Sequence, residues 1–463
     1  MEVSKAVILA AGKGEKFYPF SYFRPKPMFP VCNKPILEHI LDKLVSTGIK
    51  EICIVVGYRK GRIKNYFGSG KRHNCNITYV EQKEPLGTAD ALLKAENFTR
   101  DEPFLLVYGD LIFGEKVIPS ILKAFTGKEL GVAWIKEVNE PWKYTTVAVD
   151  KGILKRTAWK ARIGHFPSKK ALTGVYVFSP DIYYYADRAS EIFLEVENGV
   201  APPQEYDLAD SLNVAAREGE CVKCIEVDDY WIDVDVPWQV FDANDAVFKE
   251  MENRLSETYI HEKAEVSEKA VIKGKVYISE GVIIEDNVRI EGPVWLGKNT
   301  RILNGAHIYG PTVIGEECII GPYCEVSGCI GNRVRIGHCA EVFGVVLDYS
   351  WIVHFSHICG ILGERSEIGA GTITGTLRFD DEPAKVLVKG IFRNAGYRGN
   401  CIFFGDYSRT GVGALLMPGR IVGPCSIVGP GVMLMHNLPP FKIILKKEEY
   451  EIRDWNPSVY DKV

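Results

Sequence analysis

The chain has no excess of positive charge. Its 463 residues carry 56 Lys and Arg against 60 Asp and Glu, which gives a formal net charge of −4. General nucleic-acid binders neutralise phosphates with a basic surplus, so the composition argues against that class. Charged residues make up 25% and hydrophobic residues 46%. This is the balance of a globular protein, here long enough for two or three domains.

Long hydrophobic runs and a cysteine framework are also missing. No apolar stretch reaches the roughly 18 residues of a transmembrane helix, so we expect no membrane span. The first residues have too short an apolar run for a secretory signal. The twelve cysteines are scattered, and the CxxC pair Cys221 and Cys224 has no second pair or histidine cluster nearby. We therefore expect buried free thiols in a cytoplasmic protein rather than disulfides or a zinc site.

Short apolar strands alternate with amphipathic helices over the first half. The pattern predicts strands at 3–11, 51–56, 77–80 and 104–108, and helices at 35–44 and 89–95. It is typical of a parallel sheet covered on both faces, with ligands at the carboxyl ends of the strands. Turn residues fall at those ends: Gly12-Lys13-Gly14, Gly57 and Gly109-Asp110. A glycine-rich turn lets backbone N–H groups approach phosphate, although it also serves any tight turn.

The glycine turn belongs to a series of motifs in a fixed order. They are Leu9-Ala10-Ala11-Gly12-Lys13-Gly14, Pro19, Arg24-Pro25-Lys26-Pro27-Met28, Asn33-Lys34-Pro35, Val80-Glu81-Gln82, Pro85-Leu86-Gly87-Thr88-Ala89, Tyr108-Gly109-Asp110, Thr173-Gly174-Val175-Tyr176 and Trp231-Ile232-Asp233-Val234. The series resembles the signature of sugar-1-phosphate nucleotidylyltransferases. The resemblance implies a Rossmann-like α/β domain over 1–250. It also implies attack of a sugar-1-phosphate on a nucleoside triphosphate, with release of pyrophosphate. Such phosphoryl chemistry depends mainly on positioning and charge stabilisation.

The resemblance also assigns roles to single residues. It implies catalytic roles for Lys16 and Lys26, a place on the sugar side for Gly174, and Mg²⁺ ligands in Asp110 and Asp233, since Mg²⁺ prefers oxygen donors. The implied nucleotide-binding residues are Gly12, Gly14, Gln82, Gly87 and Thr88.

Several positions depart from the family pattern. The loop continues Glu15-Lys16 where the family has Thr-Arg. Glu15 would place a carboxylate beside the bound triphosphate, and Lys16 keeps the positive charge of the arginine but not its bidentate geometry. On the sugar side, the family's Tyr-Gly, Glu-Lys-Pro and asparagine are replaced by Tyr144-Thr145, Trp159-Lys160-Ala161 and Leu172. A site that loses hydroxyl-reading groups loses discrimination. Either the substrate differs, or this half no longer turns over.

From residue 260 the hydrophobic period changes to six. Aliphatic residues recur at this spacing from Val266 to Val326, resume after a four-residue shift at Ile330, and return at Ile421 and Ile427. Neither an α-helix nor an alternating strand has this period. It is typical of a left-handed parallel β-helix with hexapeptide repeats, in which each triangular coil takes three hexads. We expect this β-helix over 258–438, followed by a C-terminal tail over 439–463.

Part of this repeat, from Gly337 through His354 to Asp380, resembles bifunctional archaeal and bacterial enzymes that also N-acetylate an amino-sugar phosphate. His354 falls at the position of their catalytic base. Two lysines of the pattern are replaced by Phe343 and Glu382, so we expect acetyl transfer to be lost.

The sequence leaves three functional hypotheses. The first is a Mg²⁺-dependent nucleotidylyltransferase that forms an NDP-sugar and assembles as a homotrimer or a multiple of one, with no nucleic-acid or membrane partner. The second is a noncatalytic paralogue that binds a nucleotide or NDP-sugar and regulates or scaffolds an active partner in a hetero-oligomer. The third is an acyltransferase with a vestigial first domain. Lys26, Asp110 and Asp233 favour the first, and Glu15 and Trp159 favour the second. The base and the sugar stay open.

Overall fold

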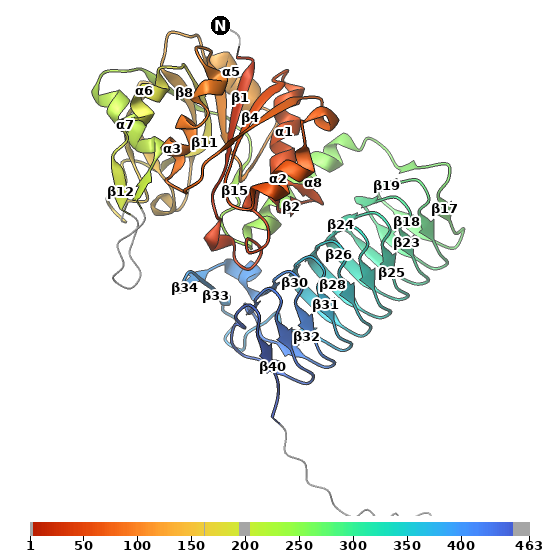
Figure 1. The fold of residues 1–463 in the computed structure, drawn as a ribbon. Helices are drawn as coiled ribbons and strands as arrows, with labels where there is room; N and C mark the ends of the chain where they lie inside the picture. The colour runs from red at the N-terminus through yellow and green to blue at the C-terminus, as the bar shows by residue number, and fades with distance from the viewer. Residues whose placement is uncertain (1–2, 162, 194–203, 448–463) are drawn as a thin grey trace, which may run out of the picture.

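The chain folds into an α/β domain followed by a parallel β-helix (Figure 1). The computed structural model describes residues 3–161, 163–193 and 204–447. In these ranges no helix has the length and apolar character needed to cross a membrane. All twelve cysteines are free thiols.

A nine-stranded sheet forms the centre of the α/β domain. Its order is β5-β4-β1-β6-β11-β8-β14-β10-β9. The bounds are β1 Lys5–Ala10, β4 Glu51–Val56, β5 Asn76–Glu81, β6 Phe104–Tyr108, β8 Gly131–Glu137, β9 Thr146–Asp150, β10 Ile153–Ala158, β11 Lys170–Phe178 and β14 Val222–Glu226.

The predicted parallel pairing holds for β5, β4, β1 and β6, the strands that the sequence indicated, whereas the other five strands make the sheet mixed. Strand β11 runs antiparallel to both β6 and β8, and β9 and β10 form a hairpin. Strands buried on both faces are apolar throughout in either direction. Their hydrophobic pattern therefore does not reveal strand direction.

Helices cover both faces of this sheet, as predicted. Alternate residues of β1 enter different hydrophobic clusters: Ile8 lies in one and Val7 in the other. This follows from the two-residue period of a strand. The helices are α1 Ile36–Ser46, α2 Lys60–Phe67, α3 Thr88–Leu93, α4 Glu96–Thr99, α5 Val117–Ala124, α6 Ile182–Ala186, α7 Leu208–Arg217 and α8 Gln239–Arg254. Short pairs outside the main sheet are β2 Pro30–Val31 with β3 Lys34–Pro35, β7 Leu111–Phe113 with β15 Trp231–Asp233, and β12 Glu191–Phe193 with β13 Gln204–Tyr206.

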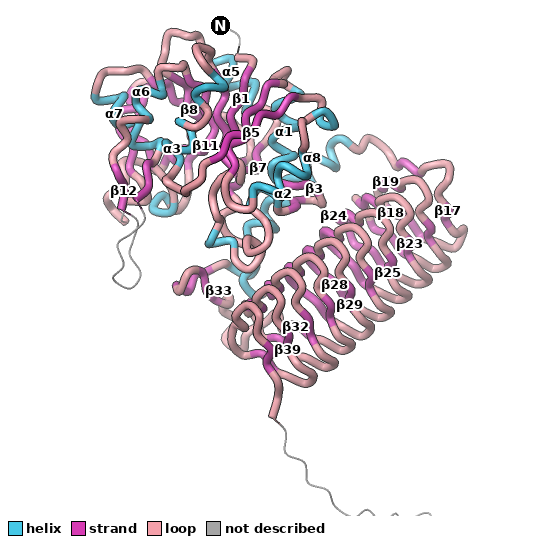
Figure 2. The backbone as a smooth tube through the Cα atoms, in the orientation of Figure 1, coloured by secondary structure: helices cyan, strands magenta, loops and turns pink. Residues whose placement is uncertain are grey.

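The β-helix stacks short parallel strands along one axis, as Figure 2 shows by the repeated strand segments between loops. A 14-stranded sheet contains β16 Tyr259–Ile260, β19 Val276–Ile278, β22 Val294–Leu296, β24 His307–Ile314, β26 Glu325–Ile330, β28 Glu341–Val346, β30 His357–Leu362, β32 Ile373–Thr374, β37 Leu415–Leu416 and β40 Met433–Leu434, with β18 Val271–Lys273, β21 Arg289–Glu291, β35 Ile402–Phe404 and β38 Ile421–Val422 paired alongside. A second sheet contains β17 Glu265–Val266, β20 Ile283–Ile284, β23 Arg301–Ile302, β25 Ile319–Ile320, β27 Arg335–Ile336, β29 Trp351–Ile352, β31 Glu367–Ile368, β36 Arg409–Thr410, β39 Ile427–Val428 and β41 Ile443–Ile444.

The coil length explains the hydrophobic period. The backbone N–H of Cys318 donates to Thr300, 18 residues earlier, whereas Ser366 donates to Ser350, 16 residues earlier. An 18-residue coil holds three six-residue periods, and a 16-residue coil accounts for the four-residue shift. The last strand, β41, lies beyond the expected boundary at 438. Residues 448–463 of the expected tail lie outside the described ranges.

One coil carries an insertion that the sequence did not predict. After β32 the chain forms the hairpin β33 Lys385–Val388 with β34 Ile391–Asn394, then the short 3-10 helix Gly396–Asn400. The turn residues Lys389 and Gly390 have φ of 48° and 77°, the left-handed values that a two-residue hairpin turn needs. In Figure 1 this hairpin stands out from the β-helix on the side of the α/β domain.

Ion pairs join the two domains, buried around Arg24 and exposed around Arg398. Arg24 Nη2 lies 2.8 Å from Asp406 Oδ1 and 3.1 Å from Glu364 Oε2. Arg398 pairs with Asp242 and Asp245 of α8 at 2.9 and 2.5 Å. The first contact holds the loop around Arg24 of the α/β domain against the β-helix. The second holds the inserted segment of the β-helix against α8 of the α/β domain.

Candidate active site

The glycine turn directly follows β1. Gly14 has φ of 62° and begins the 3-10 helix Glu15–Phe17. A Cβ on Gly14 would lie 3.1 Å from the Lys26 Cβ, whereas the space around Gly12 is open. The loop therefore packs closely against the Lys26 segment and leaves its Gly12 side accessible.

Three carboxylates meet at the end of β6. Asp110 lies in the turn between β6 and β7, and β7 pairs with β15 so that Leu111 faces Asp233. The backbone N–H of Val234 donates to the Asp110 carbonyl at 3.1 Å. This pairing brings together the two predicted metal ligands. It adds Asp235, which the sequence analysis did not single out.

Two lysines neutralise part of this acidic cluster (Asp110, Asp233 and Asp235). Lys26 Nζ lies 2.5 Å from Asp110 Oδ2 and 3.6 Å from Asp235 Oδ1, and Lys16 Nζ lies 2.7 Å from Asp235 Oδ2. Burial opposes the charge on Lys26, but the three carboxylates outweigh it and hold the Lys26 pKa above its usual range. Of the two predicted catalytic lysines of this domain, Lys26 therefore lies at the predicted metal ligand Asp110, and Lys16 lies at the neighbouring Asp235.

Asp233 differs from the other two carboxylates. Burial, reinforced by the charges of Asp110 and Asp235, raises its pKa to about 7. In the described part of the chain no cation lies within ion-pair distance of its carboxylate. Asp235, by contrast, keeps a pKa below its usual range because Lys26 and Lys16 outweigh its burial. A set of hard oxygen donors with too few cations fits a divalent metal ion.

The predicted nucleotide-reading residues also lie together. Gln82 Nε2 donates to the Gly87 carbonyl and to Asp90 Oδ2, both at 2.9 Å. Gly87 has φ of 97°, and a Cβ there would lie 2.4 Å from the Tyr206 carbonyl oxygen. Thr88 Oγ1 accepts the backbone N–H of Leu208 at 2.8 Å. The segment is therefore a tightly held turn, in which glycine is required at position 87.

Known proteins match this chain over nearly its whole length. Residues 5–250 match the sequence profile described as nucleotidyl transferase. This chain belongs to the nucleotidyl transferase family. Residues 255–371 match the profile described as GMPPB C-terminal domain.

Two named relatives match nearly the whole chain, and a third matches a little more than half of it. The bifunctional protein GlmU of Methanocaldococcus jannaschii is 32% identical over 451 residues, covering 97% of this chain and 99% of that protein. The bifunctional sugar-1-phosphate nucleotidylyltransferase/acetyltransferase of Sulfurisphaera tokodaii is 32% identical over 434 residues, covering 93% and 97%. The low-salt glycan biosynthesis nucleotidyltransferase Agl11 of Haloferax volcanii is 30% identical over 276 residues, covering 59% and 72%.

The segment that the sequence predicted to lie on the sugar side packs hydrophobic side chains at Leu172 and Tyr144. Leu172 is buried, and the Tyr144 ring lies 5.3 Å from the Trp231 ring between centroids. Gly174 has φ of 90°, and a Cβ there would lie 2.8 Å from the Tyr108 ring. Close packing therefore explains this glycine, and its predicted contact with sugar stays a prediction.

Lys160 is a site residue that the sequence analysis did not assign. Burial lowers its pKa, and the neighbouring charge of Lys16 lowers it further, while Asp235 and Asp233 oppose the shift. Lys160 therefore lies within electrostatic range of the acidic cluster. Its charge therefore adds to that of Lys16 near Asp235.

His354 lies in the β-helix, on a different domain from the acidic cluster. Its ring stacks on His338 of the preceding coil at 4.9 Å and meets the Phe355 ring at 5.2 Å. Phe343 packs near His357, with ring centroids 6.2 Å apart. The structure therefore surrounds the predicted base with aromatic rings on the surface of the coil, and its predicted role stays a prediction.

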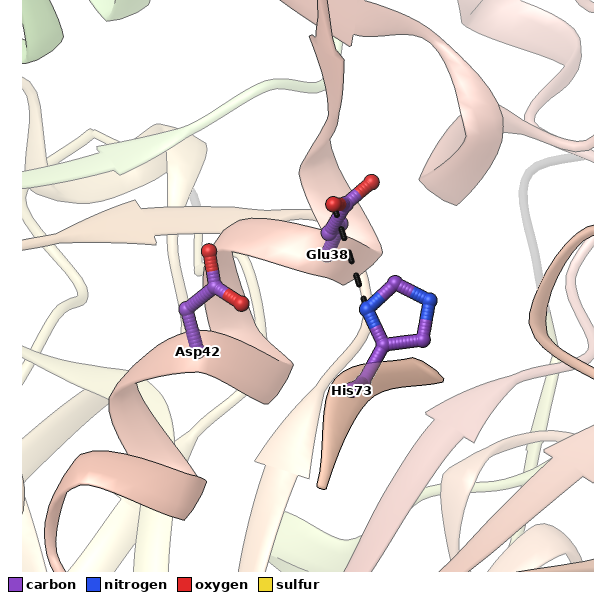
Figure 3. A group of neighbouring side chains, drawn as sticks. All are labelled: Glu38, Asp42 and His73. Carbon is purple, nitrogen blue, oxygen red and sulfur yellow. Dashed lines mark ion pairs between the residues drawn. The ribbon is translucent and has the colours of Figure 1, made fainter. Parts of the chain in front are cut away.

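A separate group of metal-ligating side chains lies on α1 and the 3-10 helix Lys71–His73. Glu38, Asp42 and His73 have ligand atoms within 4.8 Å of one another (Figure 3). Both carboxylates already have partners: Glu38 accepts from the Tyr66 hydroxyl, and Asp42 pairs with Lys34, each at 2.6 Å. We therefore assign no metal to this group.

Proposed function

We propose that this chain is a Mg²⁺-dependent sugar-1-phosphate nucleotidylyltransferase that forms an NDP-sugar and pyrophosphate. The acidic cluster with Lys16 and Lys26 supports this proposal most directly. Such a cluster suits phosphoryl transfer, in which charge must be stabilised on the phosphate oxygens.

Each part of the site has a place in this reaction. Asp110 and Asp233 would hold Mg²⁺, with Asp235 beside them. The ion, when bound, would offset the charge of the reacting phosphates. Because Lys26 pairs with Asp110 and both Lys26 and Lys16 pair with Asp235, both lysines would be within reach of those phosphates. The turn at Gly12 would offer backbone N–H groups to the triphosphate.

The remaining residues of the site would orient the two substrates. Gln82, Gly87 and Thr88 would contact the base, since they form one held turn. The sugar-1-phosphate would lie on the Leu172 and Gly174 side, with Lys160 near its phosphate. The apolar character of this side favours a sugar with fewer hydroxyl contacts than the signature implies.

We propose that the β-helix assembles the protein as a homotrimer or a multiple of one. Large apolar side chains remain exposed on it, such as Tyr323, Trp351 and Phe355, and exposed apolar surface often marks an interface. Light scattering at micromolar concentration tests this, and a monomer would contradict it.

The second candidate function is a noncatalytic subunit that binds a nucleotide or NDP-sugar and acts on an active paralogue. The apolar sugar side around Leu172 favours it. One screen separates the two functions: nucleoside triphosphates against sugar-1-phosphates, read as pyrophosphate release with Mg²⁺ and with EDTA. The first function predicts that at least one substrate pair releases pyrophosphate with Mg²⁺ and not with EDTA. The second predicts nucleotide binding without release.

A further inference from the structure

The unusual glutamate of the glycine turn has a partner from the other domain. Glu15 Oε2 lies 2.7 Å from Lys389 Nζ, at the tip of the β33–β34 hairpin. This bond, with burial opposing it and the charges of Lys389 and Lys13 reinforcing it, holds the Glu15 pKa below its usual range. The carboxylate is therefore ionised and neutralised by a residue of the β-helix domain.

The hairpin has a fixed place opposite the glycine turn. Arg398, just after the hairpin, pairs with Asp242 and Asp245 of α8. A pocket of about 610 Å³ lies between the two domains, with Lys13, Glu15 and Lys16 on one side and the segment 387–390 on the other. The tip of the hairpin is thus one wall of the space beside the turn.

The same space connects to the acidic cluster. Lys16 lines the pocket and reaches Asp235 at 2.7 Å. Glu205 of β13 lies near both Glu15 and Lys389: burial raises its pKa, Glu15 contributes to the increase, and Lys389 opposes it. The charge of Lys389 therefore affects Glu205 as well as its ion-pair partner Glu15.

A carboxylate at position 15 would repel a triphosphate held by the turn. Lys389 removes that repulsion. We propose that the triphosphate subsite is built from both domains, with Lys389 of the β-helix as a positioning residue that neutralises Glu15. This inference rests on the proposed function, because it takes a nucleoside triphosphate as the ligand of the glycine turn.

Calorimetry on the full chain tests the inference. UTP, dTTP, GTP, ATP and inorganic tripolyphosphate would be titrated, each with Mg²⁺, into wild type, Lys389→Met, Glu15→Gln and the double variant. We expect Lys389→Met to weaken binding about tenfold, the scale of one charge-assisted contact. Glu15→Gln should bind at least as well as wild type. The double variant should return to within about twofold of it, because no charge then remains to be neutralised.

A matched control removes a different cation from the same hairpin. Arg393→Met in β34 leaves the Glu15–Lys389 pair intact and should bind as wild type does. The Glu15 and Lys389 side chains are about half exposed to solvent, so circular dichroism should show unchanged folding in every variant.

Any other result of these titrations contradicts either the inference or the proposed function. Wild-type affinity in Lys389→Met overturns the inference. A double variant as weak as Lys389→Met also overturns it, because Lys389 would then act on the phosphates and not through Glu15. Nucleotide binding without pyrophosphate release would contradict the proposed function and leave the inference standing. A wild type that binds none of the probes contradicts both.

Discussion

Arg24 should stabilise the contact between the domains more than any exposed ion pair does. Its guanidinium is buried between Asp406 and Glu364, and the Asp406 side chain is 1% exposed. Arg24→Met leaves Asp406 with only the backbone N–H of Glu364 at 2.8 Å. Removing one partner of a buried pair costs about 3–5 kcal/mol, because the other charge stays buried. Burial already raises the Asp406 pKa, so protonation would limit the loss, and we expect about 3 kcal/mol at neutral pH.

Urea unfolding followed by tryptophan fluorescence measures this loss. The matched control is Arg62→Met, whose partly exposed side chain lies 3.4 Å from Glu364; it should cost under about 1 kcal/mol. Asp406→Asn in the Arg24→Met background should recover at least about 1 kcal/mol, because the unpaired charge is gone. An Arg24→Met protein within about 0.5 kcal/mol of wild type, or strictly additive effects in the double variant, would refute the reasoning.

Three further predictions follow from single positions. Burial lowers the His39 pKa to about 4 from 6.5. The contribution of neutral His39 to the free energy of unfolding should therefore be complete above pH 6.5, and about 3 kcal/mol should be lost as the pH falls towards 4. In urea titrations His39→Gln should flatten this dependence of stability on pH, and an unchanged dependence would contradict the prediction. Gly87→Ala should lower the free energy of unfolding by about 1–3 kcal/mol and weaken nucleotide binding. Gly61→Ala, at a position with open space around the glycine, should do neither. Equal effects of the two substitutions would argue against a strained turn at Gly87. Acetyl-CoA turnover with glucosamine-1-phosphate should be undetectable, and His354→Ala should leave the unfolding free energy nearly unchanged; thiol release that depends on this sugar and on His354 would be the opposite result.

The sequence predicted the local features of the fold well. The six-residue period indicated the β-helix because each coil repeats the same burial pattern, as the coils from Ile284 to Ile302 show. The strand-ending turns at Gly12 and Asp110 were expected because parallel strands end at one edge of the sheet. The antiparallel direction of β11 was not expected, since buried strands have the same hydrophobic pattern in both directions.

The contacts between distant segments were not predicted. Glu15 and Lys389 are joined only by the docking of two domains, and no spacing in the chain indicates that. Asp235 was missed although a signal existed: it lies two residues after Asp233, and alternate residues of an extended segment share a side. Lys160 was passed over because its neighbours Trp159 and Ala161 depart from the family pattern.

The measurement that tests the central claim most directly is pyrophosphate release by Asp110→Asn, compared with wild type on its best substrate pair. In the proposed mechanism Asp110 holds Mg²⁺ in the acidic cluster. Asp110→Asn removes this anionic ligand, so it should lower the rate of pyrophosphate release at least about 100-fold with Mg²⁺ present. Asp101→Asn, an exposed change just before the start of β6, should leave the rate unaltered. Equal Mg²⁺-dependent rates in wild type and Asp110→Asn would contradict the account.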